Sequence, residues 1–193
     1  MIELLLVLVS VALVVACGAF VAAEFSFVTV DRSRVDREAD EGDRRARGVR
    51  QGLRTLSTQL SAAQVGITVT NLLIGYLAQP SVASLIDAPL ESLGVSAGAV
   101  DGVALTVAFI LANAVTMIFG ELVPKNLAIA NAMGTAKAVQ GFQRGFTRII
   151  HPLVRVTNGI ANWILRRVGI EPQEELASAR SPEELTSLVR RSA

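Results

Sequence analysis

Cysteine and histidine are nearly absent from this sequence of 193 residues, which contains one of each. The single cysteine, Cys17, excludes an internal disulfide and a cysteine-rich metal site. It lies inside an apolar run, where we interpret it as a small packing residue. The single histidine, His151, leaves no set of histidines for a zinc site or a catalytic triad. No nucleophile–base pair is evident elsewhere, so we do not expect an enzyme.

Charged residues are also scarce in three apolar stretches that are long enough to cross a bilayer. Hydrophobic residues make up 51% of the chain and its mean hydropathy is +0.49, which is unusual for a soluble domain. A transmembrane helix needs about 20 mostly apolar residues. We expect spans over about 4–30, 60–78 and 103–123. The sequence therefore predicts an all-α membrane protein with three transmembrane helices.

The uncharged run of residues 4–23 has a second interpretation, which is a cleaved signal peptide. Its flank carries Glu3 and no basic residue, whereas a signal peptide begins with a positively charged region. The run is also longer than the usual apolar core of a signal peptide. Both features favour a membrane span.

Positive charge is missing from two long parts of the chain. All 18 Lys and Arg residues lie in 32–54 or 125–191, and none precedes the first span or separates the second from the third. Short cytoplasmic segments of membrane proteins are enriched in Lys and Arg. This distribution predicts a multi-pass protein of the plasma membrane with its N-terminus outside and its C-terminus in the cytoplasm.

Two segments of mixed or amphipathic character flank the spans. Residues 31–54 hold eight arginines and six acids, which predicts a solvated or interfacial helix over about 33–55. Over about 144–168, apolar residues and Trp163 recur at helical spacing among arginines, as in helices that lie in the membrane interface. A buried core helix is the alternative for this second segment. We expect both to form a juxtamembrane belt.

Two further local predictions concern a loop and a terminal helix. Pro80 and Pro89 predict a loop over 79–102. The sequence Ser-Pro-Glu-Glu from Ser181 has capping-box spacing with proline at the first helical position, so a short helix should begin there. We expect residues 173–193 to begin a cytoplasmic linker that follows a membrane domain over 1–172.

Two acidic residues stand at the inner ends of spans, Glu24 in the first and Glu121 in the third. Charged groups inside a membrane are costly and usually mark function. The alternative is that both are interfacial and solvated, and this applies more to Glu24 because it borders the arginine-rich segment.

The surroundings of Glu121 point to a cation. Pro124 has no N–H with which to bond the carbonyl of Gly120 four residues earlier, so a free backbone oxygen is expected beside the carboxylate. Carbonyl and carboxylate oxygens are the ligands that Mg²⁺ prefers. Asn71 and Thr68 on the second span would add neutral oxygens, and Lys125 would pair with Glu121 or extend to the surface. The alternative is that Pro124 only ends the helix.

The sequence resembles the transmembrane domain of the CorB/CorC and cyclin-M (CNNM) proteins, also called domain of unknown function 21. The similarity is carried by AAEFSFVTVDRSR (22–34), QVGITVTNLLIGYL (64–77), FGELVPKNLAI (119–129), RVTNGIANWILRRVGIEP (155–172) and SPEEL (181–185).

This resemblance implies a homodimer that transports Mg²⁺, generally as an exporter with Na⁺ as the coupling ion. It also implies that ATP binds only to CBS domains, which usually follow this domain and are absent from this chain. The family's ion site uses polar groups of the first and second spans and the glutamate–proline turn of the third. These positions correspond to Asn71, Gly120 and Glu121, with Pro124 and Lys125 in the motif.

The chain departs from the family pattern just before Glu24. Many relatives have serines there, whereas this chain has Val21, Ala22 and Ala23, so only backbone oxygens such as that of Ala22 are available as ligands. We expect Glu24, Gln64 and Asn113 to line the cavity, with Glu24 exchanging a proton or Na⁺.

Two hypotheses follow from these residues. The first is a dimeric Mg²⁺ transporter embedded in the lipid bilayer. The second is a membrane scaffold or Mg²⁺ sensor that regulates another transporter, which the missing hydroxyls favour. No nucleic-acid partner is expected, because the arginines are interleaved with acids or lie on the membrane surface.

Overall fold

The computed structural model describes residues 2–92 and 96–170, and these residues form helices and no β-strand. The predicted all-α fold class is confirmed. The elements are α1 (Ile2–Thr29), α2 (Arg32–Asp40), α3 (Arg44–Leu53), α4 (Leu56–Ser92), α5 (Ala97–Val115), the π-helix η1 (Thr116–Leu122), α6 (Val123–Ala130) and α7 (Ala132–Arg167).

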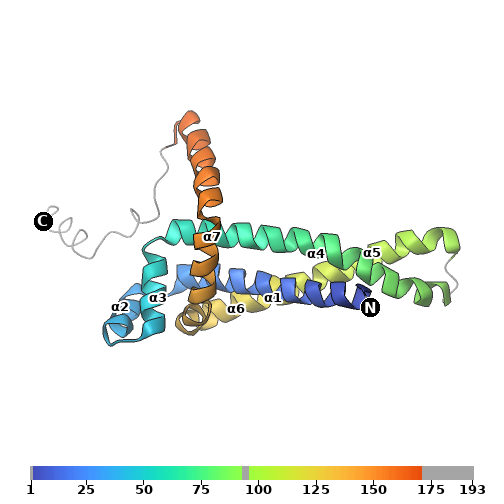
Figure 1. The fold of residues 1–193 in the computed structure, drawn as a ribbon, viewed down its shortest axis with the longest axis horizontal. Coiled ribbons are helices and arrows are strands. Elements are labelled where there is room, and N and C mark those ends of the chain that lie inside the picture. The colour runs from blue at the N-terminus through green and yellow to red at the C-terminus, as the bar shows by residue number, and fades with distance from the viewer. Residues whose placement is uncertain (1, 93–95, 171–193) are drawn as a thin grey trace, which may run out of the picture.

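Three long helical rods lie side by side and form the body of the molecule (Figure 1). They are α1, α4 and the rod formed by α5, η1 and α6 in succession. In the described part of the chain, three stretches are long and apolar enough to cross a membrane, namely Leu4–Thr29, Leu56–Ile86 and Ala99–Ala130. The predicted three spans are therefore present. The first lies within its predicted bounds, and the second and third extend beyond theirs.

The predicted loop over 79–102 is wrong for most of its length, because α4 continues through Pro80 and Pro89 to Ser92. Pro80 and Pro89 have no N–H for the carbonyls of Tyr76 and Leu85, which lie four residues earlier in the helix. The Ser81 hydroxyl donates to the Leu77 carbonyl at 2.8 Å, which is the neighbouring carbonyl and not the one that Pro80 leaves free. The helix also continues through Pro124, so Pro124 does not end it.

Helices α2, α3 and α7 gather at one end of the bundle, where α7 runs across the direction of the rods (Figure 1). The single helix predicted over 33–55 is divided into α2 and α3. Gly42 has φ of +102°, a conformation that favours glycine, and the Asp43 carboxylate starts α3 by accepting hydrogen bonds from the N–H groups of Arg45 and Ala46. The helix predicted over 144–168 begins earlier, at Ala132, where the Asn131 side chain caps it.

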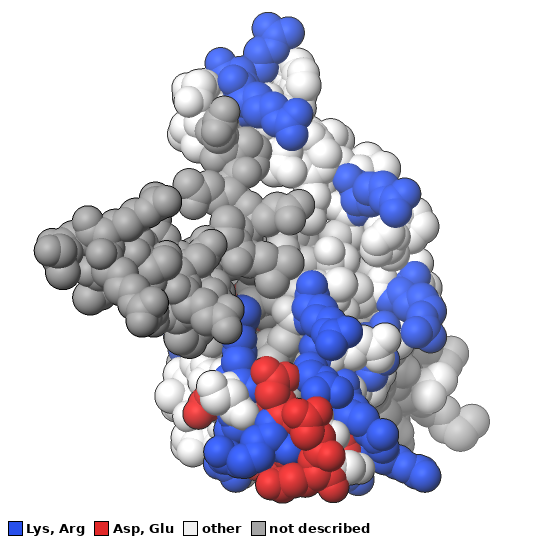
Figure 2. Space-filling view, turned by 90° about the vertical axis from the view of Figure 1, so that its left-hand side faces the viewer, with Lys and Arg blue, Asp and Glu red and all other residues white. Residues whose placement is uncertain are grey.

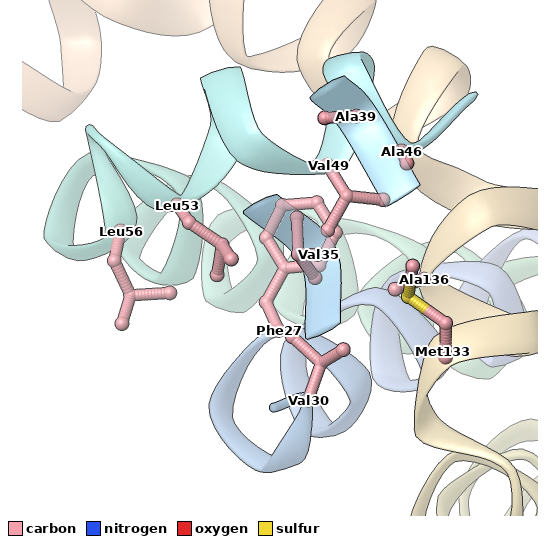
Figure 3. Close-up of a cluster of buried hydrophobic side chains, with 10 residues drawn as sticks. All are labelled: Phe27, Val30, Val35, Ala39, Ala46, Val49, Leu53, Leu56, Met133 and Ala136. Atoms are coloured by element: carbon pink, nitrogen blue, oxygen red, sulfur yellow. The ribbon is translucent and has the colours of Figure 1, made fainter. Parts of the chain in front are cut away.

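A compact apolar cluster packs α1, α2, α3 and α7 together at this end of the molecule (Figure 3). Phe27 of α1, Val35 of α2 and Val49 of α3 are each at most 2% exposed and meet in its centre. From α7, Met133 and Ala136 complete the cluster. In contrast, Ile149, Val156 and Trp163 farther along α7 are more than half exposed, which suits an amphipathic helix better than a buried one.

An ionic junction formed by Lys137, Glu38 and Asp43 connects α7 to the α2–α3 pair. The Lys137 ammonium of α7 donates to the carboxylates of Glu38 and Asp43, the latter at 2.6 Å. Figure 2 views this end of the molecule and shows acidic and basic side chains side by side there. The Lys137 hydrogen bond lowers the pKa of Asp43 to about 2 and also lowers the pKa of Glu38, while the two carboxylates raise the pKa of Lys137.

The ionic junction should hold over a wide pH range. A lowered carboxyl pKa stabilises the fold above the ordinary value near 4, and for Asp43 this is lost as the pH falls through about 2. The raised lysine pKa stabilises it below the ordinary value near 10.5 and is lost above that. We expect the distribution of distances between spin labels on α2 and α7 to stay narrow from about pH 5 to 10. It should broaden as the pH falls toward about 2 or rises above about 10.5.

A Lys137→Met variant should show the broadened distance already at neutral pH. The matched control is Arg148→Met, which removes an exposed cation from the same helix that forms no ion pair with any residue the structure describes. A narrow distance distribution in Lys137→Met would contradict this role of the junction.

Candidate cation site

The third span contains a π-helical segment around Glu121. In η1 the hydrogen bonds skip one residue more than in an α-helix, as in the bond from the Val123 N–H to the Ile118 carbonyl. In this register the carbonyl that Pro124 cannot bond is that of Phe119, whereas in an α register it would be that of Gly120. The carbonyl freed by Pro124 is thus one residue earlier than the sequence argument placed it, and Gly120 as a carbonyl ligand stays a prediction.

Helix α1 packs directly on the π-helical segment through small residues. A Cβ atom on Gly18 would lie 3.2 Å from the Phe119 carbonyl oxygen and 3.4 Å from Cγ of Pro124. A Cβ atom on Gly120 would lie 3.7 Å from Sγ of Cys17. Because Gly18 and Gly120 have no side chains, the two helices approach closely, and the face of the π-helical segment at Thr116 and Gly120 is buried in protein.

A chain of two hydrogen bonds connects the three spans at this depth. The Cys17 thiol of α1 donates to the Asn71 Oδ1 atom of α4 at 3.3 Å. The Asn71 Nδ2 atom donates in turn to the Glu121 Oε1 atom of η1 at 3.3 Å. The amide of Asn71 is therefore held between a thiol on one side and a carboxylate on the other.

The Glu121 carboxylate faces a groove of about 580 Å³ between α4 and the third span. Polar side chains on its wall are those of Asn71, Asn113, Thr116 and Glu121, and the remainder is mostly apolar. Within the described residues, no Lys, Arg or His forms an ion pair with Glu121. The motif residue Lys125 instead places its ammonium 4.7 Å from the centre of the Phe25 ring. An uncompensated carboxylate in an apolar groove is a site that a cation would stabilise.

The remaining predicted site residues fall into a different place. Glu24 is half-buried near the Gln64 side chain of α4, and neither residue lines the Glu121 groove. The Thr68 hydroxyl is exposed and donates to the Gln64 carbonyl at 2.8 Å, and Thr68 does not line the groove. Ala22 is buried. Of the predicted site residues, Asn71, Asn113 and Glu121 line the groove, whereas Glu24, Gln64 and Thr68 do not. Gly120 and Pro124 lie beside Glu121 in the same helix and pack against α1.

Cys17 is a site residue that sequence reasoning missed, because an apolar run explained it adequately. It is fully buried and contacts Asn71, which contacts Glu121. A signal was available: Cys17 precedes Glu24 by two helical turns and so shares its helix face. The facing helix could not be identified without the packing of α1 on α4.

The three long apolar helices, connected by hydrogen bonds among Cys17, Asn71 and Glu121, define this molecule as a helical membrane protein with three membrane-spanning segments. The chain belongs to the family of the cyclin M transmembrane N-terminal domain, which matches residues 8–193.

Among its relatives, UPF0053 protein MT1890 of Mycobacterium tuberculosis (strain CDC 1551 / Oshkosh) is 48% identical over 187 residues, covering 97% of this chain and 41% of the relative. UPF0053 protein YhdT of Bacillus subtilis (strain 168) is 34% identical over 184 residues, covering 95% and 40%. This chain therefore spans about two fifths of the length of these relatives.

Proposed function

We propose that this chain is the membrane domain of a Mg²⁺ transporter, and that Glu121 is the charged ligand of the transported ion. The observation that carries the proposal is the Glu121 carboxylate, which faces a groove in the membrane-spanning region and accepts a hydrogen bond from a neutral amide. Mg²⁺ is usually bound in proteins by one or two carboxylates and keeps several waters. One carboxylate in a groove of about 580 Å³ meets both requirements.

Binding of the ion requires a rearrangement of Asn71. Its Nδ2 atom faces Glu121 and its Oδ1 atom faces Cys17, so the amide presents a donor where a cation needs an acceptor. A half-turn of the amide would direct the oxygen to the ion beside Glu121 and the NH₂ group to the Cys17 sulfur, a weak acceptor. In the absence of the ion, the Asn71 NH₂ group stabilises the carboxylate in its place.

Substitutions of Cys17 should alter the affinity of the site by different amounts. Cys17→Ala removes the hydrogen bond that the amide turn must break, together with the weaker contact to sulfur that replaces it, so the dissociation constant for Mg²⁺ should fall by up to about fivefold, equivalent to ~1 kcal/mol. Cys17→Ser strengthens the hydrogen bonds of the amide both before and after the turn, so the dissociation constant should change less than in Cys17→Ala. Isothermal titration of the purified variants with Mg²⁺ measures both. Equal affinities in the wild type and both variants would contradict the amide turn.

The proposal also covers the oligomeric state, the orientation in the membrane and the coupling ion. The domain would act as a homodimer in the plasma membrane, with its N-terminus outside and the basic end of the bundle in the cytoplasm. Export of Mg²⁺ would be coupled to entry of Na⁺, with Glu24 and Gln64 as the separate coupling position. ATP would act only through CBS domains beyond this chain.

Flux measurements separate this proposal from a scaffold or sensor. The buried, hydroxyl-free residues Val21, Ala22 and Ala23 favour the scaffold, because they offer no side-chain ligand. The purified chain is reconstituted in liposomes that contain a Mg²⁺-sensitive dye, with and without a Na⁺ gradient. A transporter gives Mg²⁺ flux that the gradient accelerates. No flux above protein-free liposomes, from a helical and monodisperse protein, would favour the scaffold.

A further inference from the structure

A second hollow lies outside the cation site, at the end of the bundle where α2 and α3 meet the spans. It has a volume of about 300 Å³ and is lined by Arg32 and Asp36 of α2, Arg50 and Leu53 of α3, and Arg54 that follows α3. Three arginines around one hollow suit an anionic ligand, because a guanidinium donates paired hydrogen bonds to phosphate oxygens. The proposed transport of Mg²⁺ makes no use of it.

The charges around this hollow are only partly compensated. Arg50 donates to the Asp40 carboxylate at 2.8 Å. Arg32 and Arg54 form no ion pair with any residue in 2–92 or 96–170. Asp36 is then the one acid on the wall of the hollow, against three arginines. Even with Arg50 shared with Asp40, an excess of positive charge remains for an anionic ligand.

The position of the hollow along the chain sets its depth relative to the membrane. Arg32 follows the first span, which ends at Thr29, and Arg54 precedes the second span, which begins at Leu56. Both arginines therefore lie at the level of lipid headgroups, and Leu53 gives the hollow an apolar wall. Basic pockets at this level are suited to the headgroups of anionic lipids. The walls include no aromatic side chain on which a nucleotide base would stack.

We propose that the hollow between α2 and α3 binds the phosphate group of an anionic phospholipid. The lipid phosphate lies between Arg32 and Arg54, and its acyl chains run into the bilayer beside α1 and α4. Such a lipid would fasten the α2–α3 pair to the ends of the first two spans. The proposed lipid site therefore lies between the end of the first span and the start of the second.

The test uses the purified chain in phosphatidylcholine nanodiscs with and without phosphatidylglycerol, followed by native mass spectrometry to count the lipids it retains. The wild type should retain phosphatidylglycerol in preference to phosphatidylcholine. The double variant Arg32→Gln/Arg54→Gln should bind it at least about tenfold more weakly, because two charge-assisted contacts are lost. The double variant Arg44→Gln/Arg45→Gln, which removes two exposed arginines outside the hollow, should bind it like the wild type.

Three results would overturn the proposal. Equal retention of both lipids by the wild type would exclude selectivity for an anionic headgroup. Equal loss in both double variants would assign the binding to net charge rather than to the hollow. Displacement of the lipid by millimolar inorganic phosphate would assign the hollow to a free anion. Circular dichroism of each variant verifies that the helices are intact. Both double variants leave Glu121 unchanged and should retain Mg²⁺ flux, so a failure of the lipid proposal is distinguishable from a failure of the proposed function.

Discussion

Replacement of Glu121 by glutamine should abolish cation binding while leaving the fold intact. Glu121→Gln keeps an acceptor for the Asn71 NH₂ group but removes the negative charge from the groove. The loss of one charge of a desolvated pair costs several kcal/mol, so we expect the dissociation constant for Mg²⁺ to rise at least about 100-fold. Flux in liposomes should fall to the level of protein-free vesicles.

The thermal stability of the same variant gives an independent measure. An uncompensated carboxylate at membrane depth is destabilising, so the unfolding temperature of Glu121→Gln without Mg²⁺ should equal or exceed that of the wild type. The matched control is Asp101→Asn, an exposed acid on α5 of the same rod that does not line the groove. It should bind Mg²⁺ like the wild type. Retained affinity in Glu121→Gln would exclude this carboxylate as a ligand.

Replacement of Gly18 by valine should separate α1 from the π-helical segment. The new Cβ atom would lie 3.2 Å from the Phe119 carbonyl oxygen, closer than ordinary contacts, and the branch atoms would extend toward Pro124. Overpacking of a well-packed site costs about 1–3 kcal/mol. We expect a lowered unfolding temperature in detergent and weaker Mg²⁺ binding, because Gly120 and Glu121 move with this backbone.

Gly102→Val is the control for the helix propensity of valine. Gly102 lies within α5, and a Cβ atom there would meet no other atom within 4 Å. Both substitutions replace a helical glycine by the same residue, so their difference reports the contact with Phe119 and Pro124. Equal unfolding temperatures for the two variants would contradict the close packing of α1 on the π-helical segment.

The three spans and the presence of helices in the two charged segments were predictable from the sequence, because they depend on composition and period. Uncharged runs of sufficient length can only be accommodated as membrane helices, and the arginine-rich segments could not enter them. Mixed charges before α4 and the apolar period with Trp163 in α7 predicted helices at the boundary. The choice of Glu121 as a candidate ligand followed from the cost of a charge inside a span.

Features that depend on contacts between helices were not predictable. Pro80 and Pro124 indicate breaks in the helix when the sequence is taken alone, yet both lie within continuous helix, and a π-helical segment precedes Pro124. The division of the first belt helix into α2 and α3 depends on the positive φ of Gly42. Because other glycines and acids lie nearby, the sequence did not show at which residue the helix would be divided. The role of Cys17 required knowledge that α1 faces Asn71.

A crystal structure of the purified chain with Mn²⁺ in place of Mg²⁺ tests the central claim most directly, since anomalous scattering locates Mn²⁺ without ambiguity. We predict an anomalous peak in the groove about 2 Å from a Glu121 carboxylate oxygen, with the Asn71 amide turned so that its oxygen faces the ion. The contrary result is a groove without a peak at saturating Mn²⁺, with Glu121 still accepting its hydrogen bond from Asn71.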